Sequence, residues 1–183
     1  MGAVRKKHAL RWISLGVGVM LVAFAVLLAS QVHNDPSFKG GKLLDKPVPE
    51  FDLPSLTSSA RVSSTGLQGK VFLVNFWNSW CIPCNQEHSA LAQFYAEHKA
   101  DPNFEMIGIV RDDTASAARQ YVSQHHDPWT FVTDPQGRAS IDFGTTGQPE
   151  SYMVDAQGVV RALFRSPVSV ADLDEMLAVA QRV

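Results

Sequence analysis

Cys81 and Cys84 are the residues of this sequence whose type and spacing best suit covalent chemistry, and they are the only cysteines in 183 residues. Two residues separate them, so the two sulfur atoms can close a disulfide within one turn of chain. The thiolate is the attacking form, and Cys-x-x-Cys motifs lower the pKa of the first thiol from about 8.5 to roughly 3.5–7.5. The pair predicts dithiol–disulfide exchange, in which Cys81 attacks a disulfide and Cys84 resolves the mixed disulfide.

The segments on either side of the cysteines predict a strand followed by a helix. Residues 71–76 form an apolar run typical of a buried parallel strand, and residues 85–99 have the apolar spacing of a helix. Cys81 would then lie at a helix N-terminus, where free backbone N–H groups and the helix dipole stabilise a thiolate. Pro83 fits the first helical turn, which needs no intrahelical donor.

Half of a zinc site is the alternative interpretation of the cysteine pair. A structural zinc ion usually takes four protein ligands. His88 is suitably spaced from Cys84, but the sequence has no second cysteine pair. A metal site of Cys81, Cys84 and His88 therefore stays an alternative, and no metal or other cofactor is predicted.

The rest of the chain predicts an α/β domain with a central mixed sheet. We expect an N-terminal hairpin from residues 51–56 and 60–64, further strands at 104–110 and 129–133, and a hairpin of 151–155 with 159–164. Helices are predicted at 114–125, with Thr114 as N-cap, and at 169–181, beginning at Ser169. A strand–helix–strand unit followed by a hairpin and a closing helix places helices on both faces of the sheet.

Four further positions near the cysteines are candidates for the site. Glu87 lies one turn beyond Cys84, where it either takes the proton of Cys84 or is a solvated residue favoured by the helix dipole. Trp80 is expected at the rim of the site, and Trp77 in the core. The segment Gly147-Gln148-Pro149-Glu150 predicts a turn that leads into a strand, and its spacing alone does not bring Pro149 to Cys81.

The first 32 residues of the chain differ in charge and hydropathy from the rest. Residues 1–11 carry four basic and no acidic side chains, and residues 12–32 carry no charge at all. About 20 apolar residues span a bilayer as a helix, and the preceding basic cluster predicts a cytoplasmic N-terminus. We expect residues 1–11 in the cytoplasm, a transmembrane anchor at 12–32, a linker at 33–47 and an extracytoplasmic domain at 48–183. A cleaved signal peptide is the alternative.

Charge also bears on the partners of this domain. Beyond residue 32 the chain has 12 basic and 18 acidic residues, a net charge of −6. An acidic domain without a basic stripe argues against nucleic acid as a partner.

Together these residues resemble the membrane-anchored thioredoxin-like thiol:disulfide interchange proteins, the CcmG/DsbE, TlpA and ResA group. The resemblance covers residues 48–183 and the anchor. It is carried by the entry segment at 48–54, the active-site block at 74–87, the Gly-x-Pro-Glu loop at 147–150 and the strand and turn at 152–158. Thr145-Thr146 and Ile82-Pro83 depart from the group's commoner residues, at positions where partner choice is decided.

The resemblance implies a thioredoxin-like fold and roles for individual residues. Pro149 should be cis and pack against the disulfide, Glu87 should be a buried acid beside it, and Glu150 a second acid of the substrate groove, which Trp80 and Gln148 would also line. It implies reduction of protein disulfides outside the cytoplasm, such as the haem-site cysteines of apocytochrome c, with electrons from an integral-membrane thiol reductase.

Two other functions remain open from the sequence. The same motif serves an oxidase that introduces disulfides into exported proteins, because potential and partners set the direction of exchange. A metal-delivery module that uses Cys81, Cys84 and His88 is the alternative of a different class.

Overall fold

The computed structural model describes residues 16–27 and 42–182 of the chain. The chain divides into two compact units, residues 1–36 and 37–183. Residues 16–27 are helical, with large exposed apolar side chains such as Leu21 at 63% and Phe24 at 57%. Among the described residues, no helix has both the length and the apolar character needed to cross a membrane. The predicted segment 1–11, both ends of the predicted anchor and residues 33–41 of the linker lie outside the described residues.

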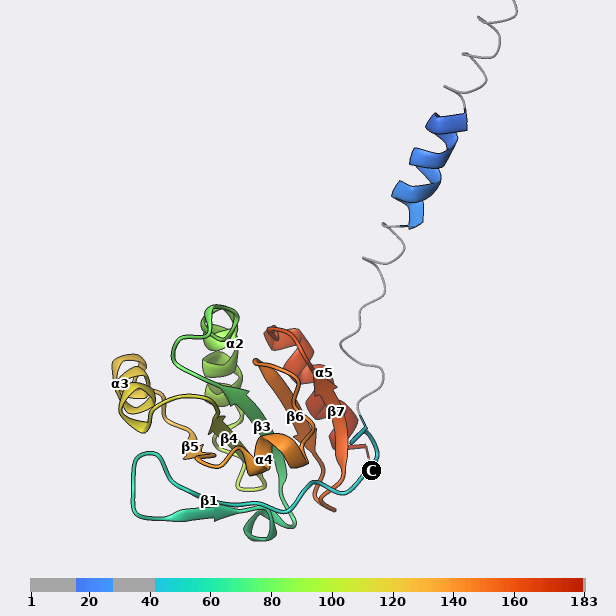
Figure 1. The fold of residues 1–183 in the computed structure, drawn as a ribbon. Coiled ribbons are helices and arrows are strands. Elements are labelled where there is room, and N and C mark those ends of the chain that lie inside the picture. Colours follow the sequence, from blue (N-terminus) through green and yellow to red (C-terminus); the bar gives the residue numbers. More distant parts are fainter. Residues whose placement is uncertain (1–15, 28–41, 183) are drawn as a thin grey trace, which may run out of the picture. The chain divides into compact units, whose positions relative to one another are not determined.

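The second unit is built on a five-stranded sheet in the order β5–β4–β3–β6–β7 (Figure 1). The strands are β3 Val71–Trp77, β4 Phe104–Val110, β5 Thr130–Thr133, β6 Glu150–Val154 and β7 Val160–Phe164. β3, β4 and β5 run parallel, β6 pairs antiparallel with β3, and β7 pairs antiparallel with β6. The predicted mixed sheet is therefore confirmed. So is the N-terminal hairpin, formed by β1 Asp52–Pro54 and β2 Arg61–Ser63.

The three longest helices of this unit begin at residues whose side chains accept from free backbone N–H groups. The helices are α2 Ile82–His98, α3 Ala115–His125, α4 Arg138–Asp142, α5 Val170–Ala180 and the short 3₁₀ helix η1 Thr65–Leu67. Thr114 caps α3 by accepting from the backbone of Ala117, and Ser169 forms a capping box with Asp172 at the start of α5. α4 and η1 were not predicted.

Two apolar clusters cover the two faces of the sheet. One contains residues of α2, α3 and α5, such as Phe94, Val122 and Leu173. The other contains Phe143, at the end of α4, together with Leu53 of β1 and Leu67 of η1. Figure 1 shows α4 on the opposite side of the sheet from α2 and α5. The sheet is thus buried between layers, which holds the end of β3 and the start of α2 rigidly in place.

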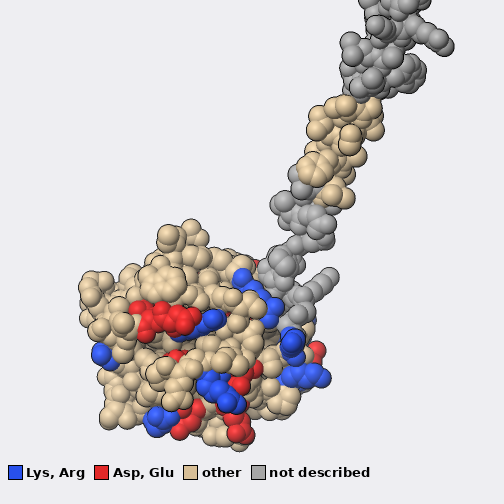
Figure 2. Space-filling view, viewed as in Figure 1, with Lys and Arg blue, Asp and Glu red and all other residues tan. Residues whose placement is uncertain are grey.

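The surface carries charge in small mixed groups. Figure 2 shows acidic and basic side chains beside one another on the face seen in Figure 1. Pairs such as Arg61–Asp52 at 2.9 Å and Arg138–Asp142 at 2.7 Å are largely exposed. Exposed pairs of this kind contribute about 0–1 kcal/mol, so burial of the two clusters dominates the stability.

Gly108 shows how closely the sheet packs on the side of the active site. A Cβ at this β4 position would lie 2.6 Å from the ring of Phe131 and 2.9 Å from Nε1 of Trp77. We predict that Gly108→Ala lowers the free energy of unfolding by about 2 kcal/mol, because overpacking a filled core forces neighbouring rings to move. Urea unfolding of the variant, with Gly147→Ala as the control where a Cβ meets no atom within 4 Å, checks this. Equal losses in both variants would contradict it.

Candidate active site

The two cysteines form a disulfide at the N-terminus of α2. The S–S distance is 2.00 Å and the Cα atoms lie 5.2 Å apart. Cys81 is the N-cap of α2, and its Sγ accepts a hydrogen bond from the backbone N–H of Cys84 at 3.1 Å. The helix begins at Ile82, three residues before the predicted start, so that Pro83 lies in its first turn. The same N–H would stabilise negative charge on Cys81 once the disulfide is reduced.

Apolar side chains surround the disulfide at the surface. Cys81 and Cys84 are only 3% and 6% exposed, whereas Trp80 is 62% and Ile82 72% exposed. Trp80 donates its indole N–H to the backbone oxygen of Asp112 at 3.1 Å, which fixes the ring beside the cysteines. Trp77 is buried in the core, as predicted. A partner must therefore approach Cys81 along the surface of Trp80 and Ile82.

Glu87 is buried one turn along α2 from Cys84, and it is 1% exposed. Its carboxylate accepts from the side-chain amide of Asn75 at 2.8 Å and from the backbone N–H of Val168 at 3.0 Å. Burial raises the pKa of Glu87 from 4.5 to about 7, against the opposing effects of Val168, Asn75 and His88. The alternative of a solvated helix residue is wrong, because the side chain points into the protein. A carboxyl group with this pKa can accept or release a proton near neutral pH.

The loop before β6 contains a cis peptide bond between Gln148 and Pro149. The predicted cis proline is therefore present, and Pro149 is buried while Gln148 is half-buried. In the sheet, Phe76 pairs with Glu150, so the register places Pro149 at the end of β3. Residues 78–80 lead from that end to Cys81, which brings this loop to the active-site edge of the sheet.

Arg111 ties this loop to the end of β4. Its guanidinium donates to Oγ1 of Thr145 at 2.7 Å and to the backbone oxygen of Gly147 at 3.5 Å. Its backbone N–H donates to the oxygen of Trp77 at 3.0 Å. Arg111 thus joins the cis-proline loop to the strand that leads to the cysteines.

Glu150 lies behind the loop and is 1% exposed. Oε1 accepts from the backbone N–H groups of Thr146 and Gly147 and from the Thr146 hydroxyl, at 2.7–3.2 Å. Oε2 accepts from the hydroxyl of Tyr152 at 2.7 Å and lies 3.5 Å from Nε of Arg165. The carboxylate is fully engaged inside the protein. These contacts favour a structural role for Glu150, in which it holds the loop in place. The direct contact with substrate that the resemblance implies stays a prediction.

Glu150→Gln is expected to lower the free energy of unfolding by about 2 kcal/mol. Glutamine carries no charge, and its side-chain NH₂ group cannot accept hydrogen bonds. The buried N–H or O–H groups that donate to that position in wild type would therefore lose their acceptor. Urea unfolding measures the change. Glu105→Gln is the matched control, because Glu105 forms a part-exposed pair with Lys70. A loss no larger than in that control would contradict the holding role.

Sequence reasoning missed three residues that the structure brings to the site. Asn75 was recognisable from the sequence, because it is the one polar residue in the apolar run of β3. Arg111 directly follows β4, at the edge where the ends of parallel strands meet. Asp127, whose side chain is hydrogen-bonded to His88, lies in a polar segment after α3, and nothing in the sequence marked it as a site residue.

The alternative metal site finds little support in this geometry. The Cys81 and Cys84 sulfur atoms are joined, and Nε2 of His88 is bonded to Asp127 at 2.7 Å. In the described part of the chain, the one group of potential ligands close enough for an ion is Glu97, His98 and Asp174, which is largely exposed and away from the cysteines. The site is therefore a dithiol–disulfide pair with a buried acid.

A thioredoxin-like sheet with a Cys-x-x-Cys disulfide at a helix N-terminus and a cis-proline loop at the same edge of the sheet defines the class of thiol:disulfide oxidoreductases. Comparison with known proteins agrees. The sequence model of the Redoxin family matches residues 43–177. The thiol:disulfide interchange protein DsbE of Allochromatium vinosum is 38% identical over 83% of this chain and 82% of its own length. DsbE of Pseudomonas aeruginosa is 36% identical over 80% of this chain and 79% of its own length.

Solved structures show the same fold. A crystal structure of a DsbE-type protein from Chlorobium tepidum covers 79% of this chain and 99% of its own, with a TM-score of 0.67 and 26% identity. The chain belongs to the Redoxin family, and within it to the DsbE group of thiol:disulfide interchange proteins. It is a thiol:disulfide oxidoreductase with Cys81 and Cys84 as its redox-active pair.

Proposed function

We propose that this protein reduces protein disulfides outside the cytoplasm, with the haem-site cysteines of apocytochrome c as its substrate and an integral-membrane thiol reductase as its electron donor. The buried acid beside Cys84 is the observation that carries the chemistry. Membership of the DsbE group supports disulfide exchange with a protein partner, and the DsbE name implies the cytochrome c substrate.

The proposed reaction begins with the reduced protein. The Cys81 thiolate attacks one sulfur of the substrate disulfide, and the other substrate sulfur leaves with the electron pair and takes a proton from water. Cys84 then gives its proton to Glu87, and its thiolate attacks Sγ of Cys81. The bond from Cys81 to substrate breaks, the Cys81–Cys84 bond forms, and the second substrate thiolate is released. The substrate gains the two electrons that the protein dithiol loses.

Residues around the cysteines are assigned the following roles. Glu87 is the proton acceptor for Cys84, because it lies one turn away and its pKa of about 7 leaves both forms populated at neutral pH. Trp80 supplies an exposed apolar surface for the partner. The segment of Gln148 and Pro149 is assigned to substrate binding, and Glu150 holds its loop through the backbone N–H groups of Thr146 and Gly147.

A membrane anchor would hold the domain near its donor and substrate. We propose residues 1–11 as a cytoplasmic segment, 12–32 as a retained transmembrane helix, 33–47 as a linker and 48–183 as the extracytoplasmic domain. The exposed apolar side chains of residues 16–27 support this, because a helix that is apolar all round suits lipid.

Reduction of a defined peptide tests the proposal. Full-length protein in detergent is reduced, freed of reductant and mixed with an oxidised peptide that contains Cys-x-x-Cys-His. We expect peptide thiols to appear as the protein dithiol is lost, faster than with an equal concentration of glutathione, and with Cys81→Ser inactive. Reduction no faster than by glutathione would contradict the function. A peptide with the histidine replaced tests the haem-site preference separately.

A further inference from the structure

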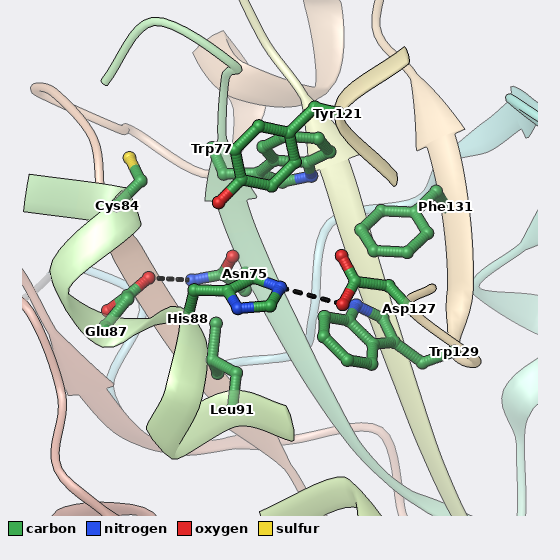
Figure 3. Close-up of a pocket in the computed structure, with 10 residues that line it drawn as sticks. All are labelled: Asn75, Trp77, Cys84, Glu87, His88, Leu91, Tyr121, Asp127, Trp129 and Phe131. Atoms are coloured by element: carbon green, nitrogen blue, oxygen red, sulfur yellow. Dashed lines mark hydrogen bonds and ion pairs between the residues drawn. The ribbon is translucent and has the colours of Figure 1, made fainter. Parts of the chain in front are cut away.

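A small cavity lies between the α2 residues Cys84, Glu87 and His88 and the rings of Tyr121 and Trp129 (Figure 3). Its volume of about 20 Å³ is enough for one water molecule. The titratable groups that line it are Cys84, Glu87 and His88 of α2, Tyr121 of α3 and Asp127. Glu87 and the side chain of Asp127 are almost fully buried, so charges on them are screened less than charges at the surface.

His88 and Asp127 form a hydrogen-bonded pair in the wall of this cavity. Nε2 of His88 donates to Oδ1 of Asp127 at 2.7 Å, and the side chains are 19% and 2% exposed. Figure 3 shows the imidazole between Glu87 and Asp127. His126, with a φ of 56°, ends α3 and turns the chain so that Asp127 faces inward. The ring of His125 lies 4.5 Å from that of His88 and covers it from outside. The imidazole is therefore fixed in one position.

Two buried polar atoms in the cavity lining point to a bound water. Among the described residues, three buried side-chain atoms have no hydrogen-bond partner, and two of them, Oδ2 of Asp127 and Nε1 of Trp77, belong to residues of this lining. A water molecule needs two or more polar partners to bind in a cavity. One water on Asp127 would fix the carboxylate that in turn holds His88.

We propose that His88, held by Asp127, is a positioning residue that sets the pH range in which Glu87 takes the proton of Cys84. This rests on the proposed function, because it assumes that Glu87 is that proton acceptor. Positive charge on His88 acts on Glu87 and favours its carboxylate form, so Glu87 is ready to accept at lower pH. His88 acts through Glu87 and forms no bond with either cysteine.

Two supporting features concern the other groups of the cavity. Burial raises the pKa of Glu87, whereas Val168, Asn75 and His88 lower it. Burial, with the charges of Asp127 and Glu87, raises the pKa of Tyr121 to about 12. Tyr121 thus keeps its proton at working pH, and the charge of His88 lowers the pKa of Glu87.

A two-step thiol assay tests the proposal. Reduced full-length protein is mixed with Ellman's reagent, an aromatic disulfide that releases a coloured thiolate. The first release reports attack by Cys81, and the second reports attack by Cys84 on the mixed disulfide. We measure both rates from about pH 5 to 9 in wild type, His88→Gln, His88→Lys and Asp127→Asn. The matched control is His98→Gln, since His98 is on the same helix, 3.7 Å from Asp174.

The acid limb of the second release is the pH range in which its rate falls as the pH is lowered. In His88→Gln we expect this limb to move up by about one pH unit, so that the rate at a given pH on the limb is about tenfold lower than in wild type. The first release should be unchanged, His88→Lys should restore the limb, and Asp127→Asn should move it in the same direction as His88→Gln by a smaller amount. His98→Gln should match wild type. Equal slowing of both releases, or a wild-type limb in His88→Gln, would overturn the proposal.

Glu87→Gln in the same assay separates this inference from the function on which it rests. If Glu87→Gln removes the acid limb while His88→Gln leaves it in place, the role of His88 fails and the role of Glu87 stands. If Glu87→Gln also leaves the limb in place, Glu87 is not the proton acceptor and both proposals fail.

Discussion

Replacing Cys84 with serine is expected to abolish turnover and to leave the substrate attached to Cys81 as a mixed disulfide. Cys81 caps α2 and keeps the N–H groups that stabilise its thiolate, so the first attack should proceed. Serine at position 84 has no sulfur to release the substrate. An oxidised Cys-x-x-Cys-His peptide incubated with full-length Cys84→Ser should therefore give a covalent adduct of one peptide per chain, measured by mass spectrometry.

The paired variant shows which cysteine attacks. Cys81→Ser should give no adduct with the same peptide, because Cys84 lies inside the first turn of α2, whereas Cys81 is its N-cap, where free backbone N–H groups stabilise the attacking thiolate. An adduct on Cys81→Ser with none on Cys84→Ser would reverse the roles of the cysteines. Adding a small thiol should release the peptide from Cys84→Ser unchanged in sequence and mass except for its reduced cysteines.

Replacing Glu87 with glutamine is expected to change how stability depends on pH. Burial raises the pKa of Glu87 from 4.5 to about 7 in the folded protein. The folded state therefore holds this proton more tightly than the unfolded state, so wild type loses stability as the pH rises from about 4.5 through 7. One pH unit corresponds to about 1.4 kcal/mol, so the loss from this group approaches about 3 kcal/mol above pH 7. Glu87→Gln has no such group and should lack that loss.

Chemical unfolding of the oxidised proteins at a series of pH values measures this difference. The free energy of unfolding of wild type should fall relative to Glu87→Gln by about 3 kcal/mol between pH 4.5 and 8. Glu97→Gln is the control, because Glu97 is an exposed residue of the same helix. Its curve should run parallel to wild type. Parallel curves for wild type and Glu87→Gln would show that Glu87 does not titrate with a raised pKa.

The fold was predictable where local sequence and burial agree. β3 and β4 are near-continuous apolar runs, and the N-caps Thr114 and Ser169 mark the starts of α3 and α5, so these elements lie within a residue or two of their predicted bounds. α4 was missed because its five residues show no apolar stripe. It depends on Asp134, whose carboxylate accepts from the backbone N–H groups at the start of the helix.

The site was predictable as far as its sequence motifs reach. The cysteine pair, predicted from its spacing, and the cis proline and buried Glu87, which only the family resemblance implied, agree with the structure. The position of Glu150 was not predictable, because its partners are loop N–H groups and the Tyr152 hydroxyl, which converge only in the folded chain. The pairing of His88 with Asp127 spans 39 residues and is likewise visible only in three dimensions.

The reduction potential tests the central claim most directly, because it decides whether this dithiol gives or takes electrons. Full-length protein is equilibrated with glutathione buffers of graded potential, and the fraction with a closed Cys81–Cys84 disulfide is measured after acid quenching. We predict a midpoint well below about −120 mV, the value of a strongly oxidising dithiol. A midpoint near about −120 mV would contradict the reductant function and favour an oxidase of exported proteins.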